Sequence, residues 1–226
     1  MSEKAIDGYR GIYFAIGLQA LVAVLFILAE AILDRTNQNL FMIFNLFLAW
    51  VPLILAVLIY KYVKNKPLVS PLGIVLSIAW LCFLPNSFYI VSDSIHLINF
   101  NSTDIIVGIV AFFMMAINGL LVGLISVYLI NLELNKRMNS KSSALILITI
   151  FLLCGFAVYL GRFLRFNSWD VITNPILLIF DVSNPIFDSN TQKNAITTSI
   201  GFFGIISTCY LILWRSINYL KSLKQG

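Results

Sequence analysis

Charged side chains are scarce in this chain, and their scarcity excludes an ordinary soluble domain. Only 11% of its 226 residues are charged, 60% are hydrophobic, and the mean hydropathy is +0.93. Soluble proteins carry about 25% charged residues. The composition therefore predicts an integral membrane protein. No RNA- or DNA-binding motif accompanies the net charge of +5, so we expect no nucleic-acid partner.

Histidine occurs once, as His96, and cysteine only as Cys82, Cys154 and Cys209. A single histidine excludes the lipid phosphatases that use one histidine as nucleophile and another as acid. The sequence also lacks an HExxH zinc motif, an adjacent glutamate pair and a GxSG serine elbow. The three cysteines lie in apolar stretches without paired spacing, which predicts buried thiols and not metal ligands.

Long apolar runs, in contrast, fill most of the chain. A hydrocarbon core about 30 Å thick needs about 20 apolar residues in a helix. The first run is longer than the roughly 7–15 residues of a signal-peptide core, which favours a retained helix. Six runs predict one all-α domain over residues 1–226, a six-helix transmembrane bundle: Gly11–Leu33, Leu40–Tyr60, Leu68–Leu84, Ile105–Ile130, Ala144–Leu164 and Ile196–Trp214.

The lysines and arginines predict the orientation of this bundle. Eleven of them flank the runs on the side of the two termini, and four lie on the other side. By the positive-inside rule, both termini are expected in the cytoplasm, and membrane lipid is the expected partner. Seven of the ten acidic residues fall on the outer side.

Two outer connections, Pro85–Asp104 and Phe166–Ala195, contain apolar stretches too short to cross a bilayer. Such stretches predict short interfacial helices. Pro85 is expected to end or kink the third span, and Asn86 to cap a new helix. In the second connection, two Asn-Pro pairs at 174–175 and 184–185 predict two further short helices.

The first of these connections carries a polar stripe. Tyr89, Asp93 and His96 share one face by helical spacing, opposite an apolar face. A phenol, a carboxylate and the only imidazole of the chain therefore point the same way. The DxxH spacing of Asp93 and His96 is a weak metal signal, and we expect neither a metal nor a cofactor.

The segment Gly161–Asp170, GRFLRFNSWD, concentrates polar residues where the fifth span ends. Arg162 lies about 27 Å along the helix from Ala144, at the outer boundary of a core about 30 Å thick. Arg162 and Arg165 are one turn apart and are expected on one face. The simpler interpretation is that they anchor the helix among headgroups, with Trp169 in the aromatic belt.

The alternative is that these groups converge into one outward-opening polar site. Carboxylates at an apolar boundary are stabilised by guanidinium groups, so Asp93 and Asp170 are expected to pair with the arginines. In such a site, Arg162 and Arg165 hold an anionic group that Tyr89, Asn167 and Trp169 line. The candidate catalytic residues are Asp93 or His96 as general base and Asp170 to orient them.

Three stretches resemble the bacterial membrane-protein family called domain of unknown function 1361. They are NLFLAW (45–50), FLPNSFYIVSDSIHL (83–97) and YLGRFLRFNSWD (159–170). Ser92 stands where the family pattern has threonine, and Phe166 where it has tryptophan, so the charges of the pattern are unchanged. The resemblance implies a six-helix-type protein of a bacterial cell membrane, in a family whose name states no activity.

Two classes of function remain open. In the first, the outer site binds, and in an enzyme processes, an anionic lipid headgroup or a polyprenyl-linked substrate. In the second, the protein is a small transporter or a membrane scaffold whose charges maintain the fold. A transporter places charges at mid-membrane depth on discontinuous helices, whereas these charges lie at the boundary. The sequence determines neither enzymatic activity nor oligomeric state.

The remaining polar and small residues of the spans predict helix packing. Gln19, Asn45 and Asn118 lie inside apolar runs, where amides usually form interhelical hydrogen bonds; the alternative is that they line a transport path. Ser199, Gly201 and Gly204 are expected to form a small-residue face for close packing of the last helix.

Overall fold

The computed structural model describes residues 10–33, 35, 37, 39–63, 68–93, 105–166, 173, 176 and 189–223. Each helix in this part of the chain has an apolar stretch long enough to cross a membrane, which confirms the predicted all-α, six-helix fold. The helices are α2 (Arg10–Leu33), α3 (Phe41–Tyr62), α4 (Pro71–Ser92), α5 (Ile105–Arg137), α6 (Ser140–Phe163) and α9 (Ser189–Leu223).

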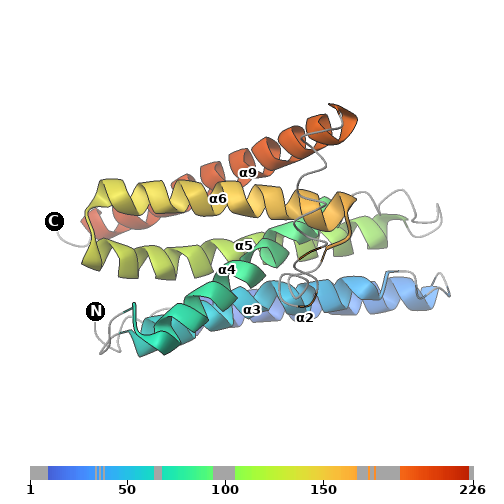
Figure 1. Cartoon of the computed structure of the whole chain (residues 1–226). Helices are drawn as coiled ribbons and strands as arrows, with labels where there is room; N and C mark the ends of the chain where they lie inside the picture. Colours follow the sequence, from blue (N-terminus) through green and yellow to red (C-terminus); the bar gives the residue numbers. More distant parts are fainter. Residues whose placement is uncertain are drawn as a thin grey trace.

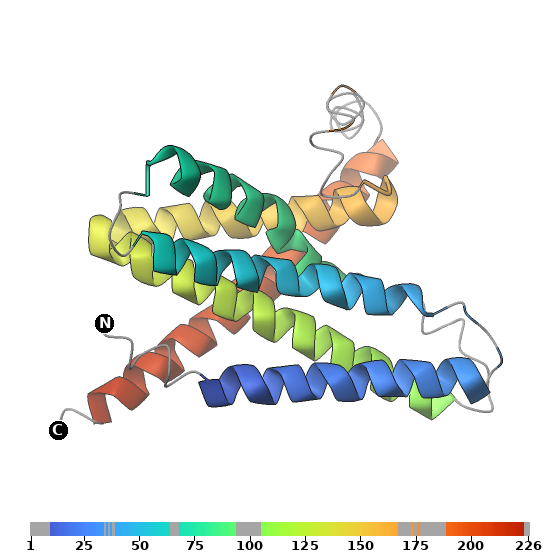
Figure 2. The same ribbon diagram turned by 90° about the horizontal axis from the view of Figure 1, so that it is seen from below.

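The helices run up and down, so that α2 begins and α9 ends at the same end of the bundle (Figure 1). We call this the terminal end, and the opposite one the far end. α5 is the most buried helix and packs against α2, α3 and α4, whereas α6 pairs with α9. Figure 2 shows α9 crossing the bundle obliquely, so that its last turns stand apart from α6.

Two helix starts are fixed by side-chain caps at the terminal end. The Ser70 hydroxyl accepts a hydrogen bond from the Gly73 N–H at 3.3 Å, with Pro71 at the first helical position. The Asn139 side chain accepts from the Ser142 N–H at 2.8 Å. Because of this cap, α6 begins at Ser140, four residues before the predicted apolar span.

Pro85 does not end the third span, which excludes one of the two outcomes expected from sequence, an end or a kink. α4 continues through Pro85 to Ser92, and the Asn86 amide donates to the Phe83 carbonyl at 3.0 Å instead of capping a new helix. A proline removes one helical hydrogen bond, and packing can offset that loss. The turns after Pro85 are therefore part of a transmembrane helix and not of a separate interfacial one.

The packing that holds these turns comes from two glycines of α5. A Cβ atom at Gly119 would lie 2.6 Å from the Ser87 carbonyl oxygen, and one at Gly123 would lie 2.8 Å from the Phe88 ring. Distances this short require glycine at both positions. The resulting close approach of α4 and α5 buries Ser87 and Phe88 completely.

The small-residue face predicted on α9 does not pack closely. Cβ atoms at Gly201 and Gly204 would meet nothing within 4 Å among the described residues. The close contact lies elsewhere, since a Cβ atom at Gly155 of α6 would lie 2.3 Å from the Ser199 carbonyl oxygen. The prediction of close packing is therefore confirmed for Ser199. It is wrong for Gly201 and Gly204, which do not face α6.

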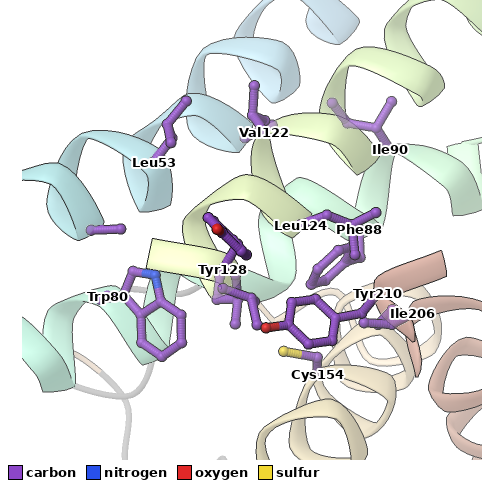
Figure 3. Close-up of a cluster of buried hydrophobic side chains, with 14 of the residues drawn as sticks. Leu53, Trp80, Phe88, Ile90, Val122, Leu124, Tyr128, Cys154, Ile206 and Tyr210 are labelled. Carbon is purple, nitrogen blue, oxygen red and sulfur yellow. The ribbon is translucent and has the colours of Figure 1, made fainter. Parts of the chain in front are cut away.

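The interior contains aromatic rings and satisfied amides. Phe88, Tyr128 and Tyr210 lie in one cluster between helices, and the buried Cys154 thiol lies beside it, as predicted for a small apolar residue (Figure 3).

The fully buried Asn118 joins three helices through its side chain. It donates to the Ile16 carbonyl at 2.9 Å and to the Gln19 side chain, and it accepts from the Trp50 indole N–H at 2.9 Å. The predicted interhelical role of these amides is therefore confirmed.

Candidate functional site

Asp93 closes α4 at the far end of the bundle. Its backbone N–H donates to the Ile90 carbonyl, which makes it the last hydrogen-bonded residue of the helix. Only 1% of its surface is exposed. A carboxylate buried this deeply needs polar partners, because an isolated charge is costly to remove from water.

Both oxygens of Asp93 have a partner, each from a different helix. Oδ2 accepts a hydrogen bond from Asn45 Nδ2 of α3 at 3.0 Å. Oδ1 lies 3.4 Å from Nη1 of Arg162, which is the second-last residue of α6. We call these three residues the Asp93 cluster. It joins α3, α4 and α6, and it agrees with the expected pairing of a carboxylate with an arginine.

A second polar contact holds α3 and α4 in register about one turn deeper. The Ser87 hydroxyl donates to the Ala49 carbonyl at 2.7 Å, and both groups are buried. Ala49 follows Asn45 by one helical turn, so the two contacts lie on one face of α3. Together they fix Asn45 opposite the end of α4.

Arg162 is only partly satisfied by the cluster. Its side chain is 16% exposed, and its one polar contact within the described chain is the 3.4 Å approach to Asp93. The buried Glu133 at the terminal end differs, because it pairs with Lys136 and, at 2.5 Å, with Arg137. A guanidinium group carries five N–H donors, so most of the donor capacity of Arg162 is not used within the described residues.

The position of Asp93 changes its protonation. Asp93 lies just beyond the membrane-spanning segment Pro71–Ser92. Burial raises the pKa of its carboxyl to about 6, while the Asn45 hydrogen bond and the Arg162 charge act in the opposite direction. Asp93 is therefore mostly ionised at neutral pH and becomes protonated in mild acid.

Tyr89 lies beside the cluster and packs against α6. A Cβ atom at Gly161 would lie 3.0 Å from the Tyr89 ring, so glycine is needed for the ring to lie on this part of the helix. The ring is thus in contact with the residue that precedes Arg162. This packing sets the distance between the ends of α4 and α6.

Arg165 does not share a helical face with Arg162, contrary to the expectation from spacing. α6 ends at Phe163, and Arg165 adopts a left-handed backbone with φ 59°. The Phe166 N–H then donates to the Leu160 carbonyl at 3.3 Å, which closes the helix end. Arg165 is exposed as a result.

Four predicted site residues, His96, Asn167, Trp169 and Asp170, lie outside the described residues, as do the two predicted helices between 166 and 195. Their roles stay predictions. In the part of the chain that is described, no three His, Cys, Asp or Glu side chains come together as metal ligands.

Sequence reasoning missed the connection of Asn45 to this site. Asn45 was expected to form an interhelical hydrogen bond, but spacing alone does not reveal that its partner is Asp93. It also missed the burial of Glu30, which is 1% exposed and accepts from Asn39 at 2.8 Å. The available signal was an acidic residue within three positions of the end of an apolar run.

Comparison with known families supports the resemblance. A family model described as "Protein of unknown function (DUF1361)" matches residues 44–209, which is well over half of the chain. The chain belongs to the DUF1361 family. The DUF1361 match includes all three residues of the Asp93 cluster. No match was found among curated proteins or solved structures.

Proposed function

We propose that the far end of this DUF1361 protein binds the phosphate of an anionic lipid headgroup or of a lipid-linked ligand. The proposal rests on the burial of Arg162 and on its small number of polar contacts among the described residues. Its guanidinium group is largely buried, yet within the described chain it makes one polar contact, at 3.4 Å. A planar guanidinium matches phosphate with two parallel N–H donors, so Arg162 is the principal phosphate ligand.

Asp93 acts in this proposal as a positioning residue. Its two oxygens are occupied by Asn45 and Arg162, and it is almost completely buried. It therefore holds the guanidinium at the helix boundary, while the donors that have no partner among the described residues are available for a ligand. Arg165 supplies a second cation at the surface, three residues further along the chain.

The depth of Arg162 favours a lipid as the source of the phosphate. Arg162 is 22 residues after the start of α6, or about 33 Å along a helix rising 1.5 Å per residue. A hydrocarbon core is about 30 Å thick, so the guanidinium lies at headgroup level. A polyprenyl-linked phosphate presents the same chemistry at the same depth.

The test is a measurement of phosphate-containing lipid that remains bound to the protein in detergent, by native mass spectrometry. Replacing Arg162 and Arg165 with glutamine is expected to reduce occupancy of the tightest site at least about tenfold, because charged hydrogen bonds contribute about 1.5–3 kcal/mol each. Arg35→Gln with Lys193→Gln is the matched control, since it also removes two cations, both exposed and both at the far end. Undiminished occupancy in the double variant would contradict the proposal.

A structural role as a membrane scaffold is the second candidate, and the burial of Asp93 between three helices favours it. Asp93→Asn separates the two. If Asp93 positions Arg162 for phosphate, this change loosens the guanidinium and lowers the amount of lipid bound per folded protein. If the cluster only maintains the fold, lipid bound per folded protein stays constant while the thermal stability changes.

A further inference from the structure

A second charged surface lies at the terminal end, opposite the Asp93 cluster. Six exposed cations from four helices occupy it, and we call them the terminal rim: Lys61, Lys136, Arg137, Lys141, Arg215 and Lys221. They come from the ends of α3, α5 and α9 and the start of α6, which the up-and-down topology brings to one end (Figure 1).

The rim keeps its positive charge at the surface. Glu133 is the one acidic residue that the described chain places at this end, and its side chain is 3% exposed. It is buried beneath Lys136 and Arg137 and pairs with both. Arg137 also donates to the Val63 carbonyl at 2.9 Å, so this pairing ties α5 to the end of α3.

Two lysines of the rim are held against tyrosine rings. Lys136 Nζ lies 5.0 Å from the centre of the Tyr60 ring, and Lys221 Nζ lies 5.8 Å from that of Tyr128. Lys221 also donates to the Tyr128 hydroxyl at 3.1 Å. Tyrosine rings with lysine ammonium groups over them combine the aromatic and basic side chains that are typical of the membrane–water interface.

The helix lengths place this end in the headgroup region. α5 has 33 residues, or about 50 Å, which exceeds a hydrocarbon core of about 30 Å. The apolar run Ile105–Ile130 ends before Lys136 and Arg137, so the excess includes the last turns of α5 that carry these two cations. Headgroup phosphates occupy that depth.

The end of α9 adds apolar contacts to the charge. Tyr219, Leu220 and Leu223 are 64%, 58% and 60% exposed, and they alternate with Arg215 and Lys221. Figure 2 shows this part of α9 standing apart from α6. A helix end that exposes both apolar and basic side chains is suited to the surface of an anionic membrane.

We propose that the terminal rim and the end of α9 bind anionic phospholipid in the leaflet that the terminal end faces. Charge complementarity and depth both favour lipid over a soluble polyanion, because the exposed leucines gain nothing from nucleic acid. Each cation near an anionic surface contributes about 1 kcal/mol, which is about fivefold in affinity.

The experiment measures binding of fluorescent phosphatidylglycerol, relative to phosphatidylcholine, to the full chain in a non-ionic detergent. The test variant is Lys141→Gln with Arg215→Gln, two exposed cations outside the Glu133 pairing. The control is Lys193→Gln with Arg35→Gln, which removes the same charges from exposed far-end positions, in the first turns of α9 and just after α2. A second test pair, Lys61→Gln with Lys141→Gln, covers the case in which Arg215→Gln impairs folding.

Wild type is expected to prefer phosphatidylglycerol at low salt and to lose most of the preference at about 0.5 M salt, where charges are screened within about 4 Å. Each test pair should reduce the preference about tenfold or more, and the control pair should leave it unchanged. Equal effects of test and control pairs, or no preference in wild type, would overturn the proposal. The loss caused by the test pairs should persist in an Arg162→Gln background, where the proposed far-end site is removed, so this result is independent of that site.

Discussion

The backbone of α6 at Gly155 touches the backbone of α9 at Ser199. A Cβ atom on Gly155 would lie 2.3 Å from the Ser199 carbonyl oxygen and 3.2 Å from the Phe203 nitrogen. Neither neighbour is a side chain that can rotate away. The pairing of the two helices therefore depends on the absence of a single methyl group.

Gly155→Ala is accordingly expected to separate α6 from α9 and to lower the unfolding temperature. Overpacking typically costs about 1–3 kcal/mol. Gly201→Ala is the matched control, because a Cβ atom there meets nothing within 4 Å of the described chain. Thermal unfolding in detergent measures both, and an equal response of the two variants would exclude the backbone contact.

The stability of the protein should depend on pH through Asp93. Its folded-state pKa of about 6 exceeds the ordinary value of 3.8, so the folded state favours the protonated form. This stabilisation is fully present below about pH 3.8 and is lost as the pH rises through about 6. Wild type should therefore gain stability relative to Asp93→Asn as the pH falls from 7 to 4.

Unfolding temperatures of both proteins across this range provide the measurement. The difference between them, and not either curve alone, isolates Asp93 from other titrating groups. A difference that stays constant, or that grows toward neutral pH, would show that the Arg162 charge outweighs the burial of the carboxyl.

Two substitutions of Arg165 distinguish the effect of its left-handed backbone from the effect of its charge. A left-handed conformation costs a residue with a side chain about 1–2 kcal/mol, and glycine avoids most of that cost. Arg165→Gly should therefore raise stability, whereas Arg165→Gln should leave it nearly unchanged. Both variants should weaken phosphate binding equally if the guanidinium is a ligand. Lipid titration measures the binding, and thermal unfolding measures the stability.

The buried Glu133 should contribute more to stability than either of its cations. Glu133→Gln removes the one negative charge from beneath Lys136 and Arg137, and the two cations then repel each other. The cost is expected to be about 1–3 kcal/mol, less than for fully buried pairs, because both cations reach solvent. Lys136→Gln is the control, since its side chain is 48% exposed and Arg137 remains. A smaller loss in Glu133→Gln than in Lys136→Gln would contradict this ranking.

Sequence determined the elements of this protein because a bilayer imposes a length and a composition on each span. Six apolar runs were enough to predict six helices, and the amides Gln19 and Asn118 were enough to predict interhelical hydrogen bonds. The orientation of the bundle stays a prediction from its lysines and arginines. So do the roles of His96 and Asp170, which lie outside the described residues.

Tertiary structure decided which side chains meet, because that depends on the distance and the angle between helices. The sequence pattern predicted an end or a kink at Pro85. In the structure α4 continues to Asp93, because the turns after Pro85 pack on Gly119 and Gly123. The spacing of Gly201 and Gly204 predicted a packing face, but the orientation of α9 about its own axis leaves both glycines without a close neighbour among the described residues. Asn45 and Asp93 are 48 residues apart in the chain, and only the antiparallel contact of α3 and α4 makes them partners.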